Sequence, residues 1–283
     1  MAQPNLMRRR LGLTLRAARK RAGLTLTTAA GQVDVSTATL SRIELGKGPI
    51  PADKLDDYLA AYKLTGAKAD EVKKLAALAS SEGRSTLLTQ YSDAIDDPFV
   101  GYLELEEIAA RASIFTAQVV PGLLQTEEYA QALITAGVMH QSARQVRSFV
   151  ELRMERQRVL RRENPLAVEC IVEEGALRRP VGGAEPLRRQ LHAVCTAMDE
   201  LPNLDFRVIP TSAGAHPGVD GQFTIFQFDA GDPIVTVESM TRMAYLEEDY
   251  DLLPYDTSFG RMRELALSRE RSREFIGELM QQL

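Results

Sequence analysis

Residues 35–44 of this 283-residue chain read VSTATLSRIE and give the clearest indication of the fold of its first part. Ser36 is a favourable N-cap for a helix, and Val35 and Leu40 have the spacing of a hydrophobic staple around that cap. Gly46 then ends the helix. Its exposed positions hold short side chains and one arginine. This suits a helix that enters the major groove of DNA, although a plain three-helix packing unit is the alternative.

Four further helices are predicted around this one. The apolar residues Leu11, Leu15, Ala18 and Ala22 repeat at helical spacing, so they form the buried stripe of a first helix. The remaining helices are expected at residues 25–33, 51–65 and 69–79. The fold expected for the chain is mainly α, with this five-helix domain followed by an α+β domain that contains a small sheet.

Charge is distributed unevenly along the chain. The whole chain carries a net charge of −5, which by itself argues against nucleic acid. Residues 1–50, however, hold nine Lys and Arg side chains against two acids, or +7, so the remaining residues carry −12. A basic N-terminal part followed by an acidic remainder is expected when one domain binds the phosphates of a nucleic acid and the other does not. A solvated basic tail is the alternative.

Residues 9–47 resemble the lambda-repressor-like, xenobiotic-response-element family of helix-turn-helix transcriptional regulators. The resemblance rests on Gly23-Leu24-Thr25, on the stretch at 35–44 and on Gly46. It implies that the helix after Ser36 is the recognition helix and that double-stranded DNA is the partner. The implied base-contacting residues are Thr37, Ala38 and Thr39, and the phosphate-contacting residues are Thr25, Ser36, Ser41, Arg42 and Lys47.

The same resemblance implies a structural ion pair. Glu44 holds a position that in this family usually pairs with an arginine of the first helix, here Arg16 or Arg19. The sequence also departs from the family in places. Leu26 stands where the family usually has glutamine, which puts one phosphate contact in doubt. Asp34 replaces the usual turn glycine, at a position that often needs a positive φ, which Asp tolerates.

After residue 80 the pattern changes to α+β. Residues 81–90 are predicted to link a DNA-binding domain at 1–80 to a regulatory and dimerisation domain at 91–283. Helices are predicted near residues 101–113, 126–137, 142–163, 184–200, 241–252 and 268–281. Strands are predicted at residues 205–209, 222–228 and 234–238, from runs of β-branched and aromatic residues between turn signals.

Four motifs in this second part resemble the domain of unknown function that follows the helix-turn-helix in many actinobacterial regulators. They are VPGLLQTEEY at 120–129, RMERQ at 153–157, EEGALRRPVGG at 173–183 and GAHPG at 214–218. The similarity covers roughly residues 90–278. It implies a genetic association with small companion proteins and often a role in development or secondary metabolism, but it assigns no ligand or activity.

The sequence contains no recognisable catalytic set or cofactor fingerprint, so neither an enzyme nor a bound cofactor is expected. His192 and Cys195 are three apart on a predicted helix, but zinc needs three or four ligands, so no metal site is expected. Glu173 and Glu174 lie close in sequence to Arg178 and Arg179. These four residues form either a polar pocket or a solvated charged face. The alternation of Arg and Glu over 151–163 favours pairing on a helix surface.

Together these features predict a sequence-specific DNA-binding regulator in the cytoplasm. No membrane span or secretory signal is recognised, and two lone cysteines fit a reducing compartment. Helix-turn-helix proteins usually read two half-sites, so a homodimer is expected, with a second domain that senses a small molecule or a companion protein. The alternatives are an antitoxin-like module that pairs with a small neighbouring protein, and an enzyme with a DNA-targeting head.

Overall fold

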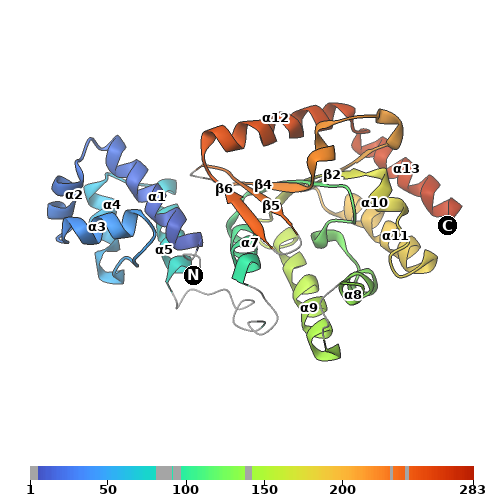
Figure 1. Cartoon of the computed structure of the whole chain (residues 1–283), viewed down its shortest axis with the longest axis horizontal. Helices are drawn as coiled ribbons and strands as arrows, with labels where there is room; N and C mark the ends of the chain where they lie inside the picture. The colour runs from blue at the N-terminus through green and yellow to red at the C-terminus, as the bar shows by residue number, and fades with distance from the viewer. Residues whose placement is uncertain (1–5, 81–90, 92–96, 138–141, 230–231, 240–241) are drawn as a thin grey trace. The chain divides into compact units, whose positions relative to one another are not determined.

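The computed structural model describes residues 6–80, 91, 97–137, 142–229, 232–239 and 242–283 (Figure 1). These residues fall into two compact units that divide near residue 90. The linker expected at 81–90 lies outside the described residues. Within the described ranges, no helix is both long enough and apolar enough to cross a membrane.

The first unit contains the five α-helices that the sequence predicts. They are α1 (Leu6–Arg21), α2 (Leu26–Gln32), α3 (Thr37–Glu44), α4 (Leu55–Ala61) and α5 (Ala67–Ala79), with a 3-10 turn η1 (Ala52–Lys54) before α4. Helix α1 begins before the predicted apolar stripe, and Met7 in its first turn is fully buried. Asp34, between α2 and α3, has a φ of 51°, so the positive φ expected at this turn is confirmed.

The second unit is built on one six-stranded sheet with the order β3-β2-β1-β4-β5-β6. Strands β1, β2 and β3 run parallel, and β4, β5 and β6 are each antiparallel to the preceding neighbour in the sheet. Their bounds are β1 (Arg111–Thr116), β2 (Ala167–Glu173), β3 (Leu204–Ile209), β4 (Phe223–Gln227), β5 (Ile234–Glu238) and β6 (Met243–Leu246). The α+β class is confirmed, although the sheet is larger than the three predicted strands.

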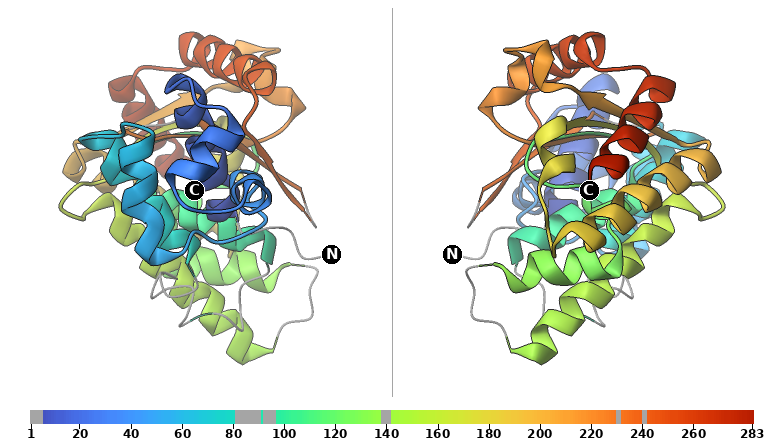
Figure 2. Two further views of the ribbon diagram at one scale, coloured as in Figure 1. Left: turned by 90° about the vertical axis from the view of Figure 1, so that its left-hand side faces the viewer. Right: turned by 90° about the vertical axis from the view of Figure 1, so that its right-hand side faces the viewer.

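Helices cover both faces of this sheet (Figures 1 and 2). One side carries α7 (Asp97–Ile108), η3 (Gly122–Leu124), α8 (Glu127–Thr135), α9 (Ala143–Arg156) and η4 (Gln157–Leu160). The long helix α12 (Asp249–Leu265) crosses the other side.

Strand β2 leads to β3 through α10 (Glu174–Arg178) and α11 (Ala184–Glu200), and α13 (Arg269–Gln282) packs on α11 and β3. Two short turns, η5 (Thr211–Ala213) and η6 (Pro217–Asp220), lie between β3 and β4.

Three sequence predictions for this unit are wrong. The helix expected at 101–113 ends at Ile108 and is followed by β1, and β2 was not predicted. Both strands are buried on both faces, so they lack the polar–apolar alternation that marks a half-exposed strand. The helix expected at 241–252 is replaced by the short edge strand β6, and α12 begins only at Asp249.

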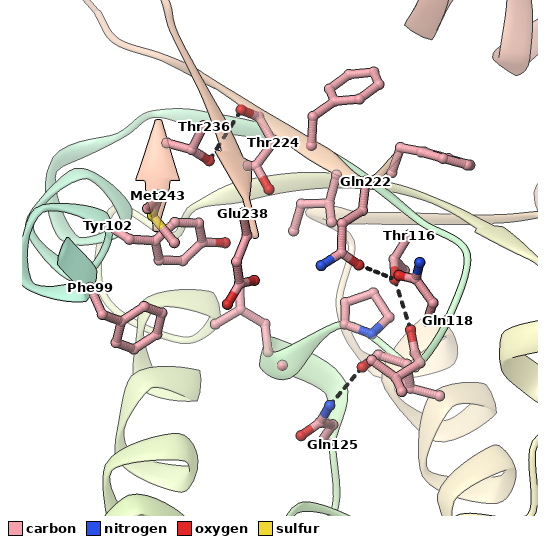
Figure 3. Close-up of a pocket in the computed structure, with 18 of the residues that line it drawn as sticks. Phe99, Tyr102, Thr116, Gln118, Gln125, Gln222, Thr224, Thr236, Glu238 and Met243 are labelled. Atoms are coloured by element: carbon pink, nitrogen blue, oxygen red, sulfur yellow. Dashed lines mark hydrogen bonds between the residues drawn. The ribbon is translucent and has the colours of Figure 1, made fainter. Parts of the chain in front are cut away.

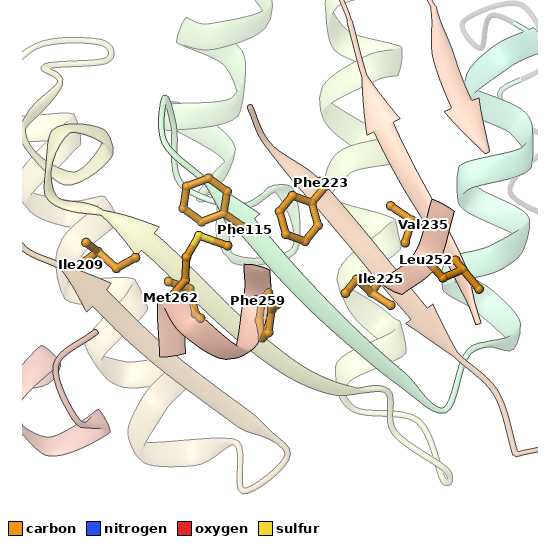
Figure 4. Close-up of a cluster of buried hydrophobic side chains, with 9 residues drawn as sticks. Phe115, Ile209, Phe223, Ile225, Val235, Leu252, Phe259 and Met262 are labelled. Atoms are coloured by element: carbon orange, nitrogen blue, oxygen red, sulfur yellow. The ribbon is translucent and has the colours of Figure 1, made fainter. Parts of the chain in front are cut away.

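A buried apolar cluster holds α12 on the sheet (Figure 4). Its members are Phe115, Ile171, Ile209, Phe223, Ile225, Val235, Leu252, Phe259 and Met262. The turn η6 packs against the same cluster at Gly218, where an added Cβ would lie 2.2 Å from Cζ of Phe115. The GAHPG motif therefore supplies a glycine that the close approach of η6 to β1 requires.

Replacing Gly218 by alanine should destabilise the second unit by about 1–3 kcal/mol, because the added methyl group overlaps the Phe115 ring. Gly260→Ala is the matched control. Gly260 lies inside α12 with no atom within 4 Å of an added Cβ, so alanine should be neutral or stabilise by up to about 1 kcal/mol. Urea unfolding followed by circular dichroism compares the two, and equal stability would contradict the packing described for η6.

Candidate nucleic-acid interface

The recognition-helix candidate α3 is held at its start by a local cap. Ser36 Oγ accepts a hydrogen bond from the backbone N–H of Thr39 at 3.0 Å. In the same way, Thr25 Oγ1 accepts from the N–H of Thr28 at 3.1 Å at the start of α2. Both hydroxyls were expected to contact phosphate. Each hydroxyl also lies 2.8 Å from a second hydroxyl, Thr25 from Thr28 and Ser36 from Thr39, and either oxygen can be the donor. A phosphate contact therefore requires that the Thr25 and Ser36 hydrogens point to the phosphate and that the partner hydroxyls donate.

The outer face of α3 is exposed to solvent. Thr37, Ala38 and Thr39, the expected base-contacting residues, are all exposed, as are Arg42 and Lys47. Ser41 is half-buried, and the inward positions of the helix are Leu40, Ile43 and Glu44. Short side chains on a protruding helix face allow its backbone to come close to base edges.

A buried ion pair fixes the other end of α3. Arg19 of α1 donates two hydrogen bonds to Glu44, from Nε to Oε1 at 2.7 Å and from Nη2 to Oε2 at 2.9 Å. Its Nη1 donates to the carbonyl of Leu24 at 2.8 Å, so one guanidinium joins α1, α3 and the start of the turn into α2. Arg16, the other candidate partner, is exposed. Burial and the negative charge of Glu44 raise the pKa of Tyr58 on α4 to about 12.

Two glycines let α1 and α3 approach each other closely. A Cβ on Gly12 would lie 2.5 Å from the carbonyl oxygen of Ile43. A Cβ on Gly46 would lie 2.5 Å from Cα of Arg9, and Gly46 has a φ of 67°. The sequence identified Gly46 as a helix end but gave no role to Gly12, because this contact depends on the crossing of two helices.

Part of the basic charge at the start of the chain is used inside the first unit. Arg10 is buried, and its Nη2 lies 4.0 Å from Oε1 of Glu71 on α5. Arg8 donates from Nη2 to the carbonyl of Ala79 at 3.3 Å. These side chains pack α1 against α5, so the net charge of +7 counted over residues 1–50 overstates the charge available for phosphate.

In the second unit, the residues considered for chemistry are separated or engaged in structural contacts. His192 is exposed while Cys195 is buried, so the two do not share a face of α11. Glu174 pairs with Arg178 at 2.6 Å, and Arg179 Nε donates to the carbonyl of Gln118 at 3.0 Å. Within the described residues, no group of three or more His, Cys, Asp or Glu side chains is placed to hold a metal ion.

The prediction that the arginines of 151–163 pair on the helix surface is only partly correct. Arg158 pairs with Glu155 at the surface, as expected. Arg156 instead points inward and binds Glu106 of α7 through two hydrogen bonds of 2.9 Å. Arg153 also turns inward and donates to the side chain of Gln125. The VPGLLQTEEY and RMERQ motifs therefore meet in the interior of the second unit.

Comparison with known families gives one match in each of the two units. A helix-turn-helix domain family matches residues 10–72. A second family, described as a domain of unknown function (DUF5753), matches residues 99–278. No curated protein and no solved structure gives a significant match.

Glu44→Gln should destabilise the first unit by about 3–5 kcal/mol, because it leaves the Arg19 guanidinium buried without a counter-charge. Arg16→Gln is the control, since this exposed arginine should change stability by less than about 0.5 kcal/mol. Urea unfolding of the full chain, followed by circular dichroism, measures both. A large loss for Arg16→Gln, with Glu44→Gln unaffected, would overturn the structural role assigned to the Arg19–Glu44 pair.

Proposed function

The chain belongs to the family of the domain of unknown function DUF5753. Because a helix-turn-helix domain family matches the residues that precede this domain, we propose that the chain is a sequence-specific transcriptional regulator. The observation that carries the proposal is the exposed face of α3 within a helix-turn-helix domain. In this proposal Thr37, Ala38 and Thr39 read base edges in the major groove. Ser41, Arg42 and Lys47 bind the adjacent phosphates, and Thr25 and Ser36 donate their hydroxyl hydrogens there.

We further propose that the chain has two domains with separate roles. Residues 1–80 form the DNA-binding domain, and residues 91–283 form a domain that dimerises and receives a signal. A two-fold dimer would present two copies of α3 to half-sites about one helical turn apart, which raises both affinity and specificity. A regulator of this kind acts where the DNA is, in the cytoplasm of a bacterial cell.

The signal changes DNA affinity only if it binds the DNA-competent and DNA-incompetent forms differently, and that difference is the coupling free energy between the two sites. A small molecule and a companion protein are the two kinds of signal considered. The second unit contains a cavity of a size suited to a small molecule, so the small molecule has a structural observation in its favour.

Fluorescence anisotropy with labelled DNA from upstream of the chain's own gene tests the proposal. Thr37→Ala should weaken binding by about 1–3 kcal/mol and relax specificity, because it removes a base contact. Arg42→Ala should weaken binding to all sequences and reduce the salt slope by about one, because it removes a phosphate contact.

Lys74→Ala is the charge-matched control, since Lys74 is exposed on α5 of the same unit. It should leave promoter affinity within about twofold of wild type, because its charge lies outside the proposed contacts. The proposal fails if wild type binds promoter and random DNA equally, or if Lys74→Ala weakens binding as much as both α3 variants.

A further inference from the structure

A cavity of about 570 Å³ lies on the side of the sheet opposite to α12 (Figure 3). Strands β1, β4 and β5 form its floor, and α7, η3 and α9 provide its other walls. The cavity lies at the carboxyl end of β1, where the parallel part of the sheet meets the antiparallel part. In sheets that contain parallel strands, ligands commonly bind outside such strand ends.

The floor of this cavity carries buried polar side chains. Thr224 and Thr236 are paired in register and face away from the apolar cluster under α12, because neighbouring residues of a strand point to opposite faces. Both are buried, as is Thr116 at the end of β1. Thr116 Oγ1 donates to the carbonyl of Val119 at 3.0 Å, and Thr236 Oγ1 donates to the carbonyl of Thr224 at 3.4 Å. The hydroxyl oxygens can still accept a hydrogen bond, so they give the floor of the cavity a polar character that suits a polar ligand.

One wall is organised around Gln125. Its Nε2 donates to the carbonyl of Val120 at 2.7 Å, and its Oε1 accepts from Nη1 of Arg153 at 2.7 Å. Gly122 makes room for the guanidinium, because a Cβ there would lie 3.2 Å from Nη1 of Arg153. The η3 turn therefore holds Arg153 in one orientation at the edge of the cavity.

Arg153 differs from the arginine beside it. Arg156 uses its Nε and Nη2 to bind both carboxylate oxygens of Glu106. In Arg153 only Nη1 donates a hydrogen bond, and its acceptor is the neutral amide of Gln125. Among the described residues, the Nε–Nη2 edge of Arg153 has no acceptor, and no carboxylate oxygen lies within 4 Å of the guanidinium nitrogens. Burial and the positive charge of Arg156 lower the pKa of Arg153 to about 10, so the guanidinium remains charged at neutral pH.

The Arg153 side chain is half-buried, and no carboxylate is hydrogen-bonded to its free two-nitrogen edge. A carboxylate is the group that fits this edge. A second charge faces the same space. Glu238, at the end of β5, points into the cavity between Phe99 and Gln125 (Figure 3). Its charge acts on Arg153 and Arg156, but among the described residues no basic nitrogen lies within 4 Å of its carboxylate. A doubly charged anion such as phosphate would be repelled by this carboxylate, whereas an amine or hydroxyl could donate to it.

We propose that this cavity binds a small amino or hydroxy acid, with its carboxylate on the Nε–Nη2 edge of Arg153 and its amine or hydroxyl on Glu238. The apolar part of the molecule lies against Ile114 and Met243, which also line the cavity. The binding site stands on its own geometry, and its role as the signal that controls DNA binding rests on the function proposed above.

Ligand-observed NMR with the full chain and no DNA tests this proposal. The probes are the proteinogenic amino acids and their 2-hydroxy analogues, each paired with its primary amide, which removes the carboxylate charge. At least one acid should bind wild type at least roughly tenfold more tightly than its amide, since hydrogen bonds between charged groups are worth more than neutral ones. Absence of binding by every acid, or equal binding of acids and amides, overturns the proposal.

Variants then assign the contacts. Arg153→Gln should weaken the acid that binds by at least roughly tenfold, whereas Arg158→Gln, an exposed arginine of η4 immediately after α9, should not. If Arg153→Gln does not fold, Arg153→Lys, which keeps the charge but loses the two-nitrogen edge, should show the same weakening. Unchanged binding in the folded Arg153 variant overturns the assignment.

Glu238→Gln tests the second contact, and it should reduce the preference for an amino acid over the matching acid that lacks the amine. An unchanged preference removes Glu238 from the proposal. Because no DNA is present, a negative result here leaves DNA recognition by α3 intact. A failure of the promoter titration likewise leaves this binding result intact.

Discussion

The buried pair of Arg19 and Glu44 is the interaction on which the first unit depends. One guanidinium satisfies a carboxylate at the end of α3 and a carbonyl in the turn between α1 and α2, so the orientation of α3 relative to α1 is fixed by directional bonds. Gly12 then allows the two helices to approach closely. A buried pair of this kind adds little net stability against an apolar alternative, but losing one partner is costly. Its value here is geometric, because α3 must present one face outward.

Arginines also organise the second unit, in two different ways. Arg156 is neutralised by Glu106 and lies over the rings of Phe99 and Tyr102, with its guanidinium 5.1 and 5.4 Å from their centroids. It therefore joins α9 to α7 as a structural element. Arg153, one turn earlier on the same helix, is half-buried and has only a neutral amide as hydrogen-bond partner among the described residues. That contrast distinguishes a packing arginine from one suited to bind a ligand.

Local signals in the sequence predict much of this structure. The caps at Ser36 and Thr25, and the turn at Asp34, act over a few residues, so the helices of the first unit could be found from sequence alone. The helices that start after Thr126 and Ser268 are also predicted close to their observed starts, and both begin with a side-chain cap. The central strands β1 and β2 were missed because burial on both faces removes their alternation. Arg153 was missed as a cavity residue, although it follows the buried Val150 at helical spacing and so interrupts an apolar stripe.

DNA recognition by α3 can be measured by selecting DNA from a random library with the purified chain and sequencing the bound fragments. Recognition by a dimer through α3 should give an enriched motif of two symmetric half-sites spaced by about ten base pairs. Thr39→Ala should change the preferred base at one position in each half-site. Selection of DNA with no enriched motif, or of the same motif with the same base preferences by both proteins, would contradict recognition by α3.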